Sequence, residues 1–544
     1  MPATDQAPCH EATVRAAPPP GGEGGAAGLD DAGRRWVLAA AVGGSSLAFI
    51  VGSVVNVALP ALQRDLGASV AEVQWVLNAY LLLLGSLLLV GGAVGDRVGR
   101  RRTFLAGVAV FGAATAACGL APTVGWLVAA RAVQGLGAAL LVPTSLALVS
   151  AAFPEGEARG RAIGTWAGFS ALTTALGPVL GGWLVDALSW RWVFFAVVPL
   201  AAATFALGVR RVPESRPSGE EGALDWPGGA LAALGFGAAV WGLVAAGERG
   251  WADAAVWAGL AGGAALLAAF VWWEGRAAAP LVPLGLFRSA AFSGANAMTL
   301  LLYFGLNGVL FFLPFNLIQV QGYSATAAGA AFLPFSLTMG LLSRRVGGLA
   351  ERWGARRVIV AGALVAALGM ALLAVPGARG GPLGGSYWAT FFPPMLVLGI
   401  GMTLAVAPLT AVVMNAADDA HGGAASGVNN AAARVAALLA IAVLGVVALG
   451  VFGGALDERL AGAPPGAAEA VAPFRADLTG AQLPDGLGGA ERARLEAVVG
   501  GAFVTAFRWV AGIAAAAAAL SALVAGLTIP PAPPDAGRGG VGDD

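Results

Sequence analysis

The chain alternates between long stretches almost without charged residues and short connections that carry most of the charge. A helix needs about 20 apolar residues to cross the hydrocarbon core of a bilayer, and the uncharged stretches have about this length. The pattern therefore predicts an all-α integral membrane protein with 14 transmembrane helices. The predicted spans are 36–59, 73–94, 103–120, 124–149, 162–185, 192–209, 226–246, 254–273, 292–315, 325–342, 358–376, 387–411, 424–452 and 502–529.

The composition agrees with a membrane protein. Hydrophobic residues make up 58% of the 544 residues and charged residues 11%, whereas charged residues are about 25% of an ordinary soluble domain. The formal net charge is zero, so the sequence gives no reason to expect nucleic acid as a partner. Cys9 and Cys118 are not expected to pair, and His10 and His421 are too far apart to indicate a metal site. We therefore expect no metal and no cofactor.

A short charged hairpin, Gly92 to Arg102, separates the second and third predicted spans and reads GAVGDRVGRRR. Basic residues in short loops mark the cytoplasmic face of a membrane protein. Glycines allow a tight turn and a close approach of helices. The candidate functional residues of this hairpin are Gly92, Asp96, Arg97, Gly99, Arg100 and Arg101.

The hairpin recurs 255 residues later as GGLAERWGARR, with Glu351 and Arg352 in place of Asp96 and Arg97. The chain therefore contains two related halves, a construction typical of secondary transporters. This repeat predicts two six-helix bundles separated by two inserted helices.

The repeat also sets the predicted domain boundaries. The bundles occupy 34–211 and 277–529, and a linker at 212–276 adds the two extra spans. Residues 1–33 and 530–544 are rich in Pro, Gly and Ala and are predicted to be disordered tails. Residues 453–501 are too polar for a span and are predicted to form a long external loop, with a short helix at 489–499.

The distribution of arginine predicts the orientation. Of the 31 arginines, 20 lie in segments that this scheme places in the cytoplasm and 8 in external loops. This bias follows the positive-inside rule. We therefore expect a multi-pass protein of the cell membrane with both termini in the cytoplasm.

Two further strings lie inside predicted spans. LVAARAVQGLGAA, at 127–139, places Arg131 at hydrocarbon depth, where an unpaired charge costs at least ~2.5 kcal/mol. We expect Arg131 to face the cavity and to bond to polar groups such as Gln134, next to Gly135, or Asn56. The alternative is a structural bond that only pins helices together.

The second string, ALGPVLGGWL at 175–184, combines a helix-bending proline with small residues. Pro178 removes a backbone donor, and Gly177, Gly181 and Gly182 leave a smooth groove for a neighbouring span. A helix of this kind can act as a rocking surface or a seal.

These motifs resemble those of the major facilitator superfamily. The strings VVNVALP, SWRWVFF, PLVPLGLF, QGYSATAAG and ASGVNNAAAR are similar to its fourteen-span drug:proton antiporter branch, the EmrB/QacA family. The resemblance implies the major facilitator fold, a part for Arg131 in proton transfer and an antiporter motif at 175–184. It also implies that the hairpin charges form a latch, pairing in one access state and separating in the other. A plain topogenic loop is the alternative for the hairpin.

One position departs from the family pattern. Val51 stands where family members commonly carry an aspartate that is linked to proton or cation handling. No acidic residue falls inside a predicted span, although a buried carboxylate is the obvious proton carrier. Coupling would then use groups at the cavity mouths, such as Asp96 or Asp186, or protons carried by the substrate, or be absent.

The residues expected to line a cavity are polar side chains among aromatic ones, as in ligand pockets generally. A neutral, zwitterionic or anionic amphiphile, met by Arg131 or Arg434, fits them better than a lipophilic cation. An interhelical hydrogen bond is the alternative role for each polar side chain. The candidates are Asn56, Asn78, Tyr80, Gln134, Asn296, Tyr303, Asn307, Asn316, Gln319, Asn429 and Arg434.

We therefore expect a monomeric membrane efflux transporter that exports small amphiphilic compounds or drugs by alternating access, in exchange for protons. An uncoupled facilitator or a metabolite transporter of the same fold is the alternative. An intramembrane enzyme would need a cluster of His, Asp or Glu at membrane depth. The predicted spans contain none, so we expect no enzymatic activity.

Overall fold

The structure is a computed structural model that describes residues 29–153, 157–216, 225–376, 387–416, 422–461, 471 and 488–531. Within these ranges all regular secondary structure is helical. Fourteen helical segments there are long and apolar enough to cross a membrane. The prediction of an all-α membrane protein with 14 spans is confirmed.

The first half contains six spans. They are formed by α1 (Asp31–Leu66), α2 (Val70–Val98), α3 (Arg100–Gly119), α4 (Val124–Ala152), α5 (Glu157–Ala187) and the pair α6 (Trp192–Phe195) and α7 (Val198–Arg211).

The two inserted spans are α8 (Trp226–Arg249) and α9 (Ala254–Glu274), which a short 3₁₀ helix, η1 (Leu284–Arg288), separates from the second half. The second half is formed by α10 (Ala290–Phe315), η2 (Asn316–Val320), α11 (Ala325–Ala330), α12 (Leu333–Trp353), α13 (Ala355–Leu372), α14 (Tyr387–Thr390), α15 (Phe392–Asn415), α16 (Gly422–Leu460) and α18 (Gly489–Thr528). The span predicted at 325–342 is therefore divided between α11 and α12.

Local sequence signals fix several helix ends. The Asp30 side chain accepts a hydrogen bond from the Gly33 amide and begins α1. Gly67, with a φ of 60°, ends it in a left-handed conformation that costs glycine nothing. Ser69 and Glu72 then form a reciprocal capping box at the start of α2. These caps make the tight connection between the first two spans.

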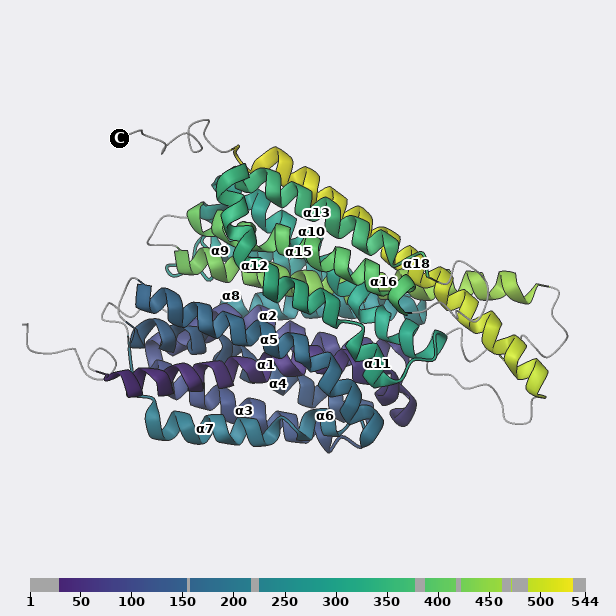
Figure 1. Cartoon of the computed structure of the whole chain (residues 1–544), viewed down its shortest axis with the longest axis horizontal. Helices are drawn as coiled ribbons and strands as arrows, with labels where there is room; N and C mark the ends of the chain where they lie inside the picture. Colours follow the sequence, from purple (N-terminus) through teal and green to yellow (C-terminus); the bar gives the residue numbers. More distant parts are fainter. Residues whose placement is uncertain are drawn as a thin grey trace, which may run out of the picture.

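The helices form two bundles that lie side by side (Figure 1). In the first half α4 packs against α2 and α3, and α5 packs against α1. In the second half α15 packs against α12 and α13, and α18 packs against α10. The halves meet chiefly where α5 contacts α11 and α2 contacts α16, with further contacts of α5 with α12 and of α1 with α10 and α11.

The inserted helices lie on one side of this interface. α8 packs against both α2 and α16, so it contacts the two halves at once. α9 packs on α8 and has the smallest buried share of the fourteen candidate spans. On this side α8 covers the seam between the halves.

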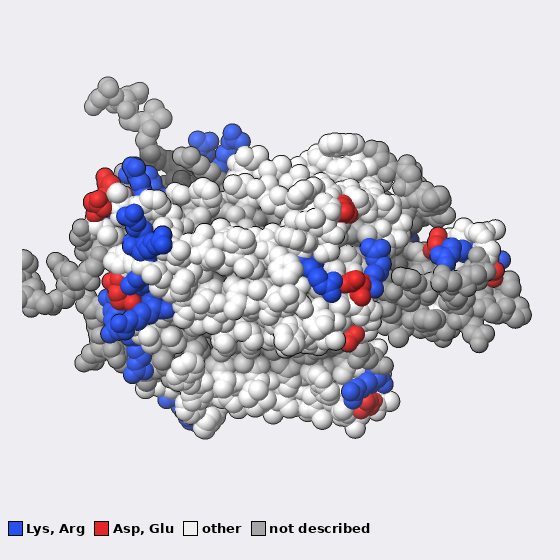
Figure 2. All heavy atoms as spheres, turned by 90° about the horizontal axis from the view of Figure 1, so that it is seen from below, with Lys and Arg blue, Asp and Glu red and all other residues white. Residues whose placement is uncertain are grey.

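Charged side chains gather toward the two ends of the face seen in Figure 2, and the surface between them is almost uncharged. We call one end the hairpin end, because the α2–α3 and α12–α13 connections lie there, and the other the far end. α1 begins and α18 finishes at the hairpin end (Figure 1).

The segment 453–501, predicted as a loop, is helical at both ends. α16 continues to Leu460, and α18 begins at Gly489, so the helix predicted at 489–499 is the first part of the last span. Both helices project beyond the far end of the bundle (Figure 1). Leu456 and Leu495 are buried there, so packing between protein segments sustains helices that hydropathy alone does not reveal. Residues 462–470 and 472–487 lie outside the described residues.

Candidate functional site

Arg131 of α4 is enclosed inside the first half. Its Nε donates to the Val76 carbonyl at 2.9 Å, and Nη1 donates to Oε1 of Gln134 at 2.5 Å. The Gln134 amide in turn donates to the Thr115 hydroxyl at 2.7 Å. The guanidinium also lies 4.3 Å from the centre of the Tyr80 ring. This network joins α2, α3 and α4.

The expected hydrogen bond between Arg131 and Gln134 is confirmed, and Asn56, the alternative partner, is not among its described partners. The expectation that Arg131 faces the cavity is wrong, because Arg131 is only 1% exposed. The reason is the close approach of α2 and α4. A Cβ atom added at Gly135 would lie 2.5 Å from the Tyr80 carbonyl oxygen, so the two backbones leave no space beside the guanidinium.

Arg434 of α16 lies at the interface between the halves. A Cβ atom added at Gly85 of α2 would lie 3.1 Å from the Cβ atom of Arg434, so the two helices approach closely here. The charge of Arg434 interacts with Tyr80 of α2 and with Tyr303 of α10. Arg434 is half-buried. Three of the predicted cavity residues thus come together where α2, α10 and α16 meet.

A cavity of about 130 Å³ lies between α10, α15 and α16. Its polar lining includes Tyr303, Thr410, Asn429 and Asn430, and its apolar lining includes Leu409 and Met414. A site that mixes a few polar groups with apolar side chains suits an amphiphilic ligand.

Other predicted cavity residues make contacts between or within helices. The Asn429 amide donates to Oδ1 of Asn296 at 3.2 Å and to the Thr299 hydroxyl at 2.7 Å, which ties α16 to α10. Asn307 donates to the carbonyl of Tyr303 on its own helix at 2.8 Å. These hydrogen bonds match the alternative role given above for each polar side chain, a structural bond between or within helices.

Four predicted cavity residues lie apart from the lining given above. Asn78 is fully buried, and neither of its amide atoms has a partner among the described residues. Asn56 is half-buried on α1. Asn316 accepts a hydrogen bond from Gln321 at 3.1 Å, while the Gln319 amide nitrogen is buried without a described partner.

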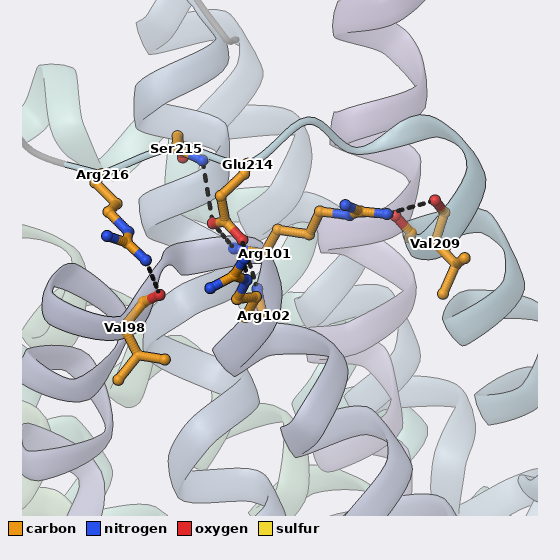
Figure 3. A network of polar contacts seen from close by, with 8 residues as sticks. Val98, Arg101, Arg102, Val209, Glu214, Ser215 and Arg216 are labelled. Carbon is orange, nitrogen blue, oxygen red and sulfur yellow. Dashed lines mark hydrogen bonds and ion pairs between the residues drawn. The ribbon is translucent and has the colours of Figure 1, made fainter. Parts of the chain in front are cut away.

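Glu214, which the sequence analysis missed, holds the first hairpin in place. Figure 3 shows its carboxylate beside the start of α3. It accepts hydrogen bonds from the backbone amides of Arg101 at 3.0 Å and Arg102 at 3.3 Å. It also lies against Gly99, whose φ of 122° favours glycine. The segment after α7 therefore caps α3 from a distance of more than 100 residues in sequence.

The arginines of the hairpin bind the same segment and the end of α7. Arg101 Nη2 donates to the Val209 carbonyl at 2.6 Å, and Arg216 Nη2 donates to the Val98 carbonyl at 2.9 Å (Figure 3). Arg100 Nε pairs with Asp96 at 3.0 Å. Each of these contacts lies within the first half.

The second hairpin repeats the turn geometry of the first. Gly354, between α12 and α13, has a φ of 84°, and it corresponds to Gly99. Arg352 is exposed, and the side chain of Glu351 lies outside the described residues. In the first hairpin, Gly92 contacts Pro143 of α4 and Arg97 is half-buried.

The glycines of the 175–184 string form two packing surfaces on α5. Gly177 and Gly181 lie against Ser53 and Val54 of α1, within the first half. Gly182 lies against the Ala325 carbonyl of α11, in the second half, and Gly329 of α11 lies against the Pro178 carbonyl. The two halves thus approach to backbone contact at the far end.

Polar contacts reinforce this junction. Asp186, at the end of α5, accepts hydrogen bonds from the amides of Ala325 at 3.0 Å and Thr326 at 2.7 Å, and from the Thr326 hydroxyl at 2.6 Å. On the other side of the interface Gln74 of α2 packs against Gly445 of α16.

Nearer the hairpin end some glycines of this interface have free surroundings. Gly164 and Gly168 of α5 and Gly340 of α12 have no described atom within 4 Å of an added Cβ. The same helix, α5, therefore touches the backbone of the second half at the far end, whereas these glycines have no close described neighbour.

The SWRWVFF string has a structural explanation. Asp65 at the end of α1 accepts hydrogen bonds from Trp190 Nε1 at 2.8 Å and from Arg191 Nη1 at 2.6 Å. Arg191 also stacks on the Trp190 ring. This cluster fastens the turn between α5 and α6 to α1.

A second set of acidic residues was also missed. Glu274 and Asp225 are buried side by side at the hairpin end of α8 and α9, and Asp225 caps α8. The sequence Asp-Trp-Pro at 225–227 could have predicted this cap, because it places a proline in the first turn of a helix directly after an aspartate cap. Among the described residues, no group of His, Cys, Asp or Glu could hold a metal ion.

Comparison with known proteins agrees with this architecture. The family model of the Major Facilitator Superfamily matches residues 41–441. A tetracenomycin C resistance and export protein of Streptomyces glaucescens is 35% identical over 500 residues, covering 91% of both chains. A puromycin resistance protein of Streptomyces alboniger is 38% identical over 424 residues, covering 77% of this chain and 83% of that protein.

Among solved structures, a bacterial homolog of the human lysosomal transporter Spinster superposes with a TM-score of 0.63 at 18% identity, covering 91% of this chain and 98% of that one. This likeness shows the fold. The family match and the relatives of similar length show that the chain belongs to the major facilitator superfamily.

Proposed function

We propose that this protein exports small amphiphilic compounds, antibiotics among them, across the cell membrane by alternating access. One observation carries the proposal: two halves that touch at the far end and leave space at the hairpin end, with a polar-lined cavity between α10, α15 and α16 of the second half. The names of relatives at 35% and 38% identity, which specify resistance or export, support the direction of transport.

In this proposal the hairpin end faces the cytoplasm, and both termini lie there. The arginines of the two hairpins support this orientation by the positive-inside rule. The described structure then corresponds to an inward-open state that admits substrate from the cytoplasm or the inner leaflet. The protein works as a monomer, with one cavity per chain, and performs no covalent chemistry.

Opening to the outside requires the far-end contacts to break and the hairpin ends to come together. The hairpin charges of Asp96, Arg97, Glu351 and Arg352 then form the latch between halves. Arg131 keeps α2, α3 and α4 together as one rigid body during this motion, because its hydrogen bonds lie entirely within the first half.

Proton exchange provides the driving force in this proposal. A proton moving inward down a potential of 100 mV yields ~2.3 kcal/mol, enough for about a 50-fold substrate gradient. Asp186 is the acidic residue that bridges the halves at the outer face, and Asp96 lies at the inner face. We assign the coupling to these two groups, because the described acidic residues lie near helix ends or in connections.

Two assays test the proposal. Expression in a bacterial host that lacks its own exporters should raise the inhibitory concentration of at least one compound in a chemically diverse panel, relative to the host with an empty vector. Purified protein in proteoliposomes should then move that compound faster when a pH gradient is imposed. Flux that is indifferent to the gradient would favour an uncoupled facilitator, and no flux for any compound would contradict transport.

A further inference from the structure

The interface between the halves contains a cation without an anionic partner. Arg434 lies against Gly85, near the rings of Tyr80 and Tyr303. A guanidinium carries five N–H donors and no acceptor. None of the described residues accepts a hydrogen bond from the Arg434 guanidinium or forms an ion pair with it.

The contrast with Arg131 shows why this matters. Arg131 is enclosed, and its donors are used by the Val76 carbonyl and the Gln134 side chain. Arg434 is only half-buried, and it lies where α16 meets α2. A charged group at membrane depth is costly unless it is paired or meets water. The available partner is one that enters from outside the protein.

The protein supplies no carboxylate at this depth. Every acidic side chain that the structure describes lies near a helix end or in a connection. The surroundings of Arg434 therefore keep a positive potential that repels cations and attracts anions.

The neighbouring cavity can hold the apolar part of such a ligand. It measures about 130 Å³ and is lined by Tyr303 from the Arg434 side and by Leu409 and Met414. An apolar cavity of about 150 Å³ accommodates benzene. The space is therefore close to that of a single aromatic ring, and aromatic rings pack favourably on tyrosine, which lines this cavity as Tyr303.

We propose that Arg434 binds the anionic group of the transported compound and that the substrates are amphiphilic anions: an aromatic or apolar body carrying a carboxylate, sulfonate or phenolate. This inference rests on the proposed export function and specifies the substrate class of the same site. The anionic group pairs with the guanidinium, and the apolar body lies beside Tyr303.

The test compares two probes that carry one aromatic ring and differ in charge, 4-phenylbutyrate and 4-phenylbutanol. The full-length protein is placed in nanodiscs of zwitterionic phosphatidylcholine, and equilibrium binding of the tritiated probes is measured against empty nanodiscs. The wild type should bind the carboxylate about 10-fold or more tightly than the alcohol, as expected for charge-assisted hydrogen bonds. Equal affinities would overturn the proposal without any variant being made.

Variants then locate the effect. Arg434→Gln should lower the affinity for 4-phenylbutyrate about 10-fold or more and leave that for 4-phenylbutanol within twofold. Arg434→Lys, which keeps the charge, should retain most of the preference for the anion. Arg508→Gln is the matched control, because Arg508 also lies in a span but donates to the Ala374 carbonyl. A loss of preference in the control, or none in Arg434→Gln, would contradict the assignment.

Lipid phosphate is the competing source of the same chemistry. Replacing the phosphatidylcholine with phosphatidylglycerol should leave the binding of 4-phenylbutyrate to the wild type unchanged, once binding to Arg434→Gln in the same lipid is subtracted as background. Loss of binding in the wild type alone would assign the site to a lipid headgroup and overturn the proposal. Export of uncharged compounds with no preference for anions would refute this inference and leave the proposed export function standing.

Discussion

Removing the carboxylate of Asp186 should open the far end of the protein. Its three hydrogen bonds reach from α5 in the first half to the first turn of α11 in the second. The Asp186→Ala substitution deletes all three without touching the glycine contacts beside them. The closed far end then loses a polar bridge but keeps its apolar packing.

The size of the effect follows from the position of Asp186. Replacing an aspartate that caps a helix with alanine costs about 0.5–2 kcal/mol. Asp186 is exposed, so water competes for its hydrogen bonds. The three bonds together therefore stabilise the closed state by less free energy than three buried bonds would. We expect the closed state to lose about 1–2 kcal/mol, which shifts the ratio of open to closed molecules about 5- to 30-fold.

Cysteine labelling measures this shift. Ala328 of α11 is fully buried beside the junction. In a background with Cys9→Ser and Cys118→Ser, Ala328→Cys should react slowly with a membrane-impermeant maleimide. The rate should rise about 5- to 30-fold when Asp186→Ala is added, because labelling then proceeds through the more populated open state.

The matched control is Asp65→Ala, which removes an aspartate at the same end whose contacts to Trp190 and Arg191 stay within the first half. Its labelling rate should stay within about twofold of the parent, since no bond between halves is lost. A rate for Asp186→Ala within that same twofold range, or an equal rise in the control, would refute the assignment of Asp186 as a bridge between halves.

Three further substitutions test other parts of the structure. Glu214→Ala should lower the melting temperature and slow export, because the hairpin loses a cap with a value of about 1 kcal/mol; fluorescence-detected thermal unfolding measures this, and an unchanged melting temperature would contradict it. Arg131→Ala should abolish export and reduce the yield of folded protein, because Gln134 loses its partner at a cost of about 1–3 kcal/mol; normal export at normal yield would disprove its role. Gly182→Leu should abolish export, since the side chain would overlap the backbone of α11, whereas Gly512→Leu on α18, where an added Cβ has no described atom within 4 Å, should transport normally; equal transport by the two variants would contradict the proposed contact.

The spans were predictable because the bilayer imposes their length and polarity on the sequence. The duplicated hairpin also predicted two halves, because its glycines and arginines recur at matching positions. Hydropathy failed at 453–501, since it registers burial in lipid and not the packing of helices outside it. Leu456 and Leu495 are buried by protein there.

The contacts of single side chains were harder to predict. Gln134 lies one helical turn from Arg131, so their hydrogen bond follows from helix geometry. Asn56 is on another helix, whose rotation and depth are not encoded in a hydropathy pattern. Glu214 reaches Arg101 across 113 positions only because α7 ends beside the start of α3. Contacts of this kind depend on the assembled bundle.

The position of α8 makes the protein asymmetric toward the surrounding lipid. Because α8 contacts both α2 and α16, it walls off that flank of the central space. The opposite flank, between α5 and α12, is bordered at the hairpin end by Gly164 and Gly340, beside which the described structure leaves open volume. We expect a compound dissolved in the lipid to enter sideways on this flank. Bulky side chains in place of Gly164 and Gly340 should then slow uptake from the lipid.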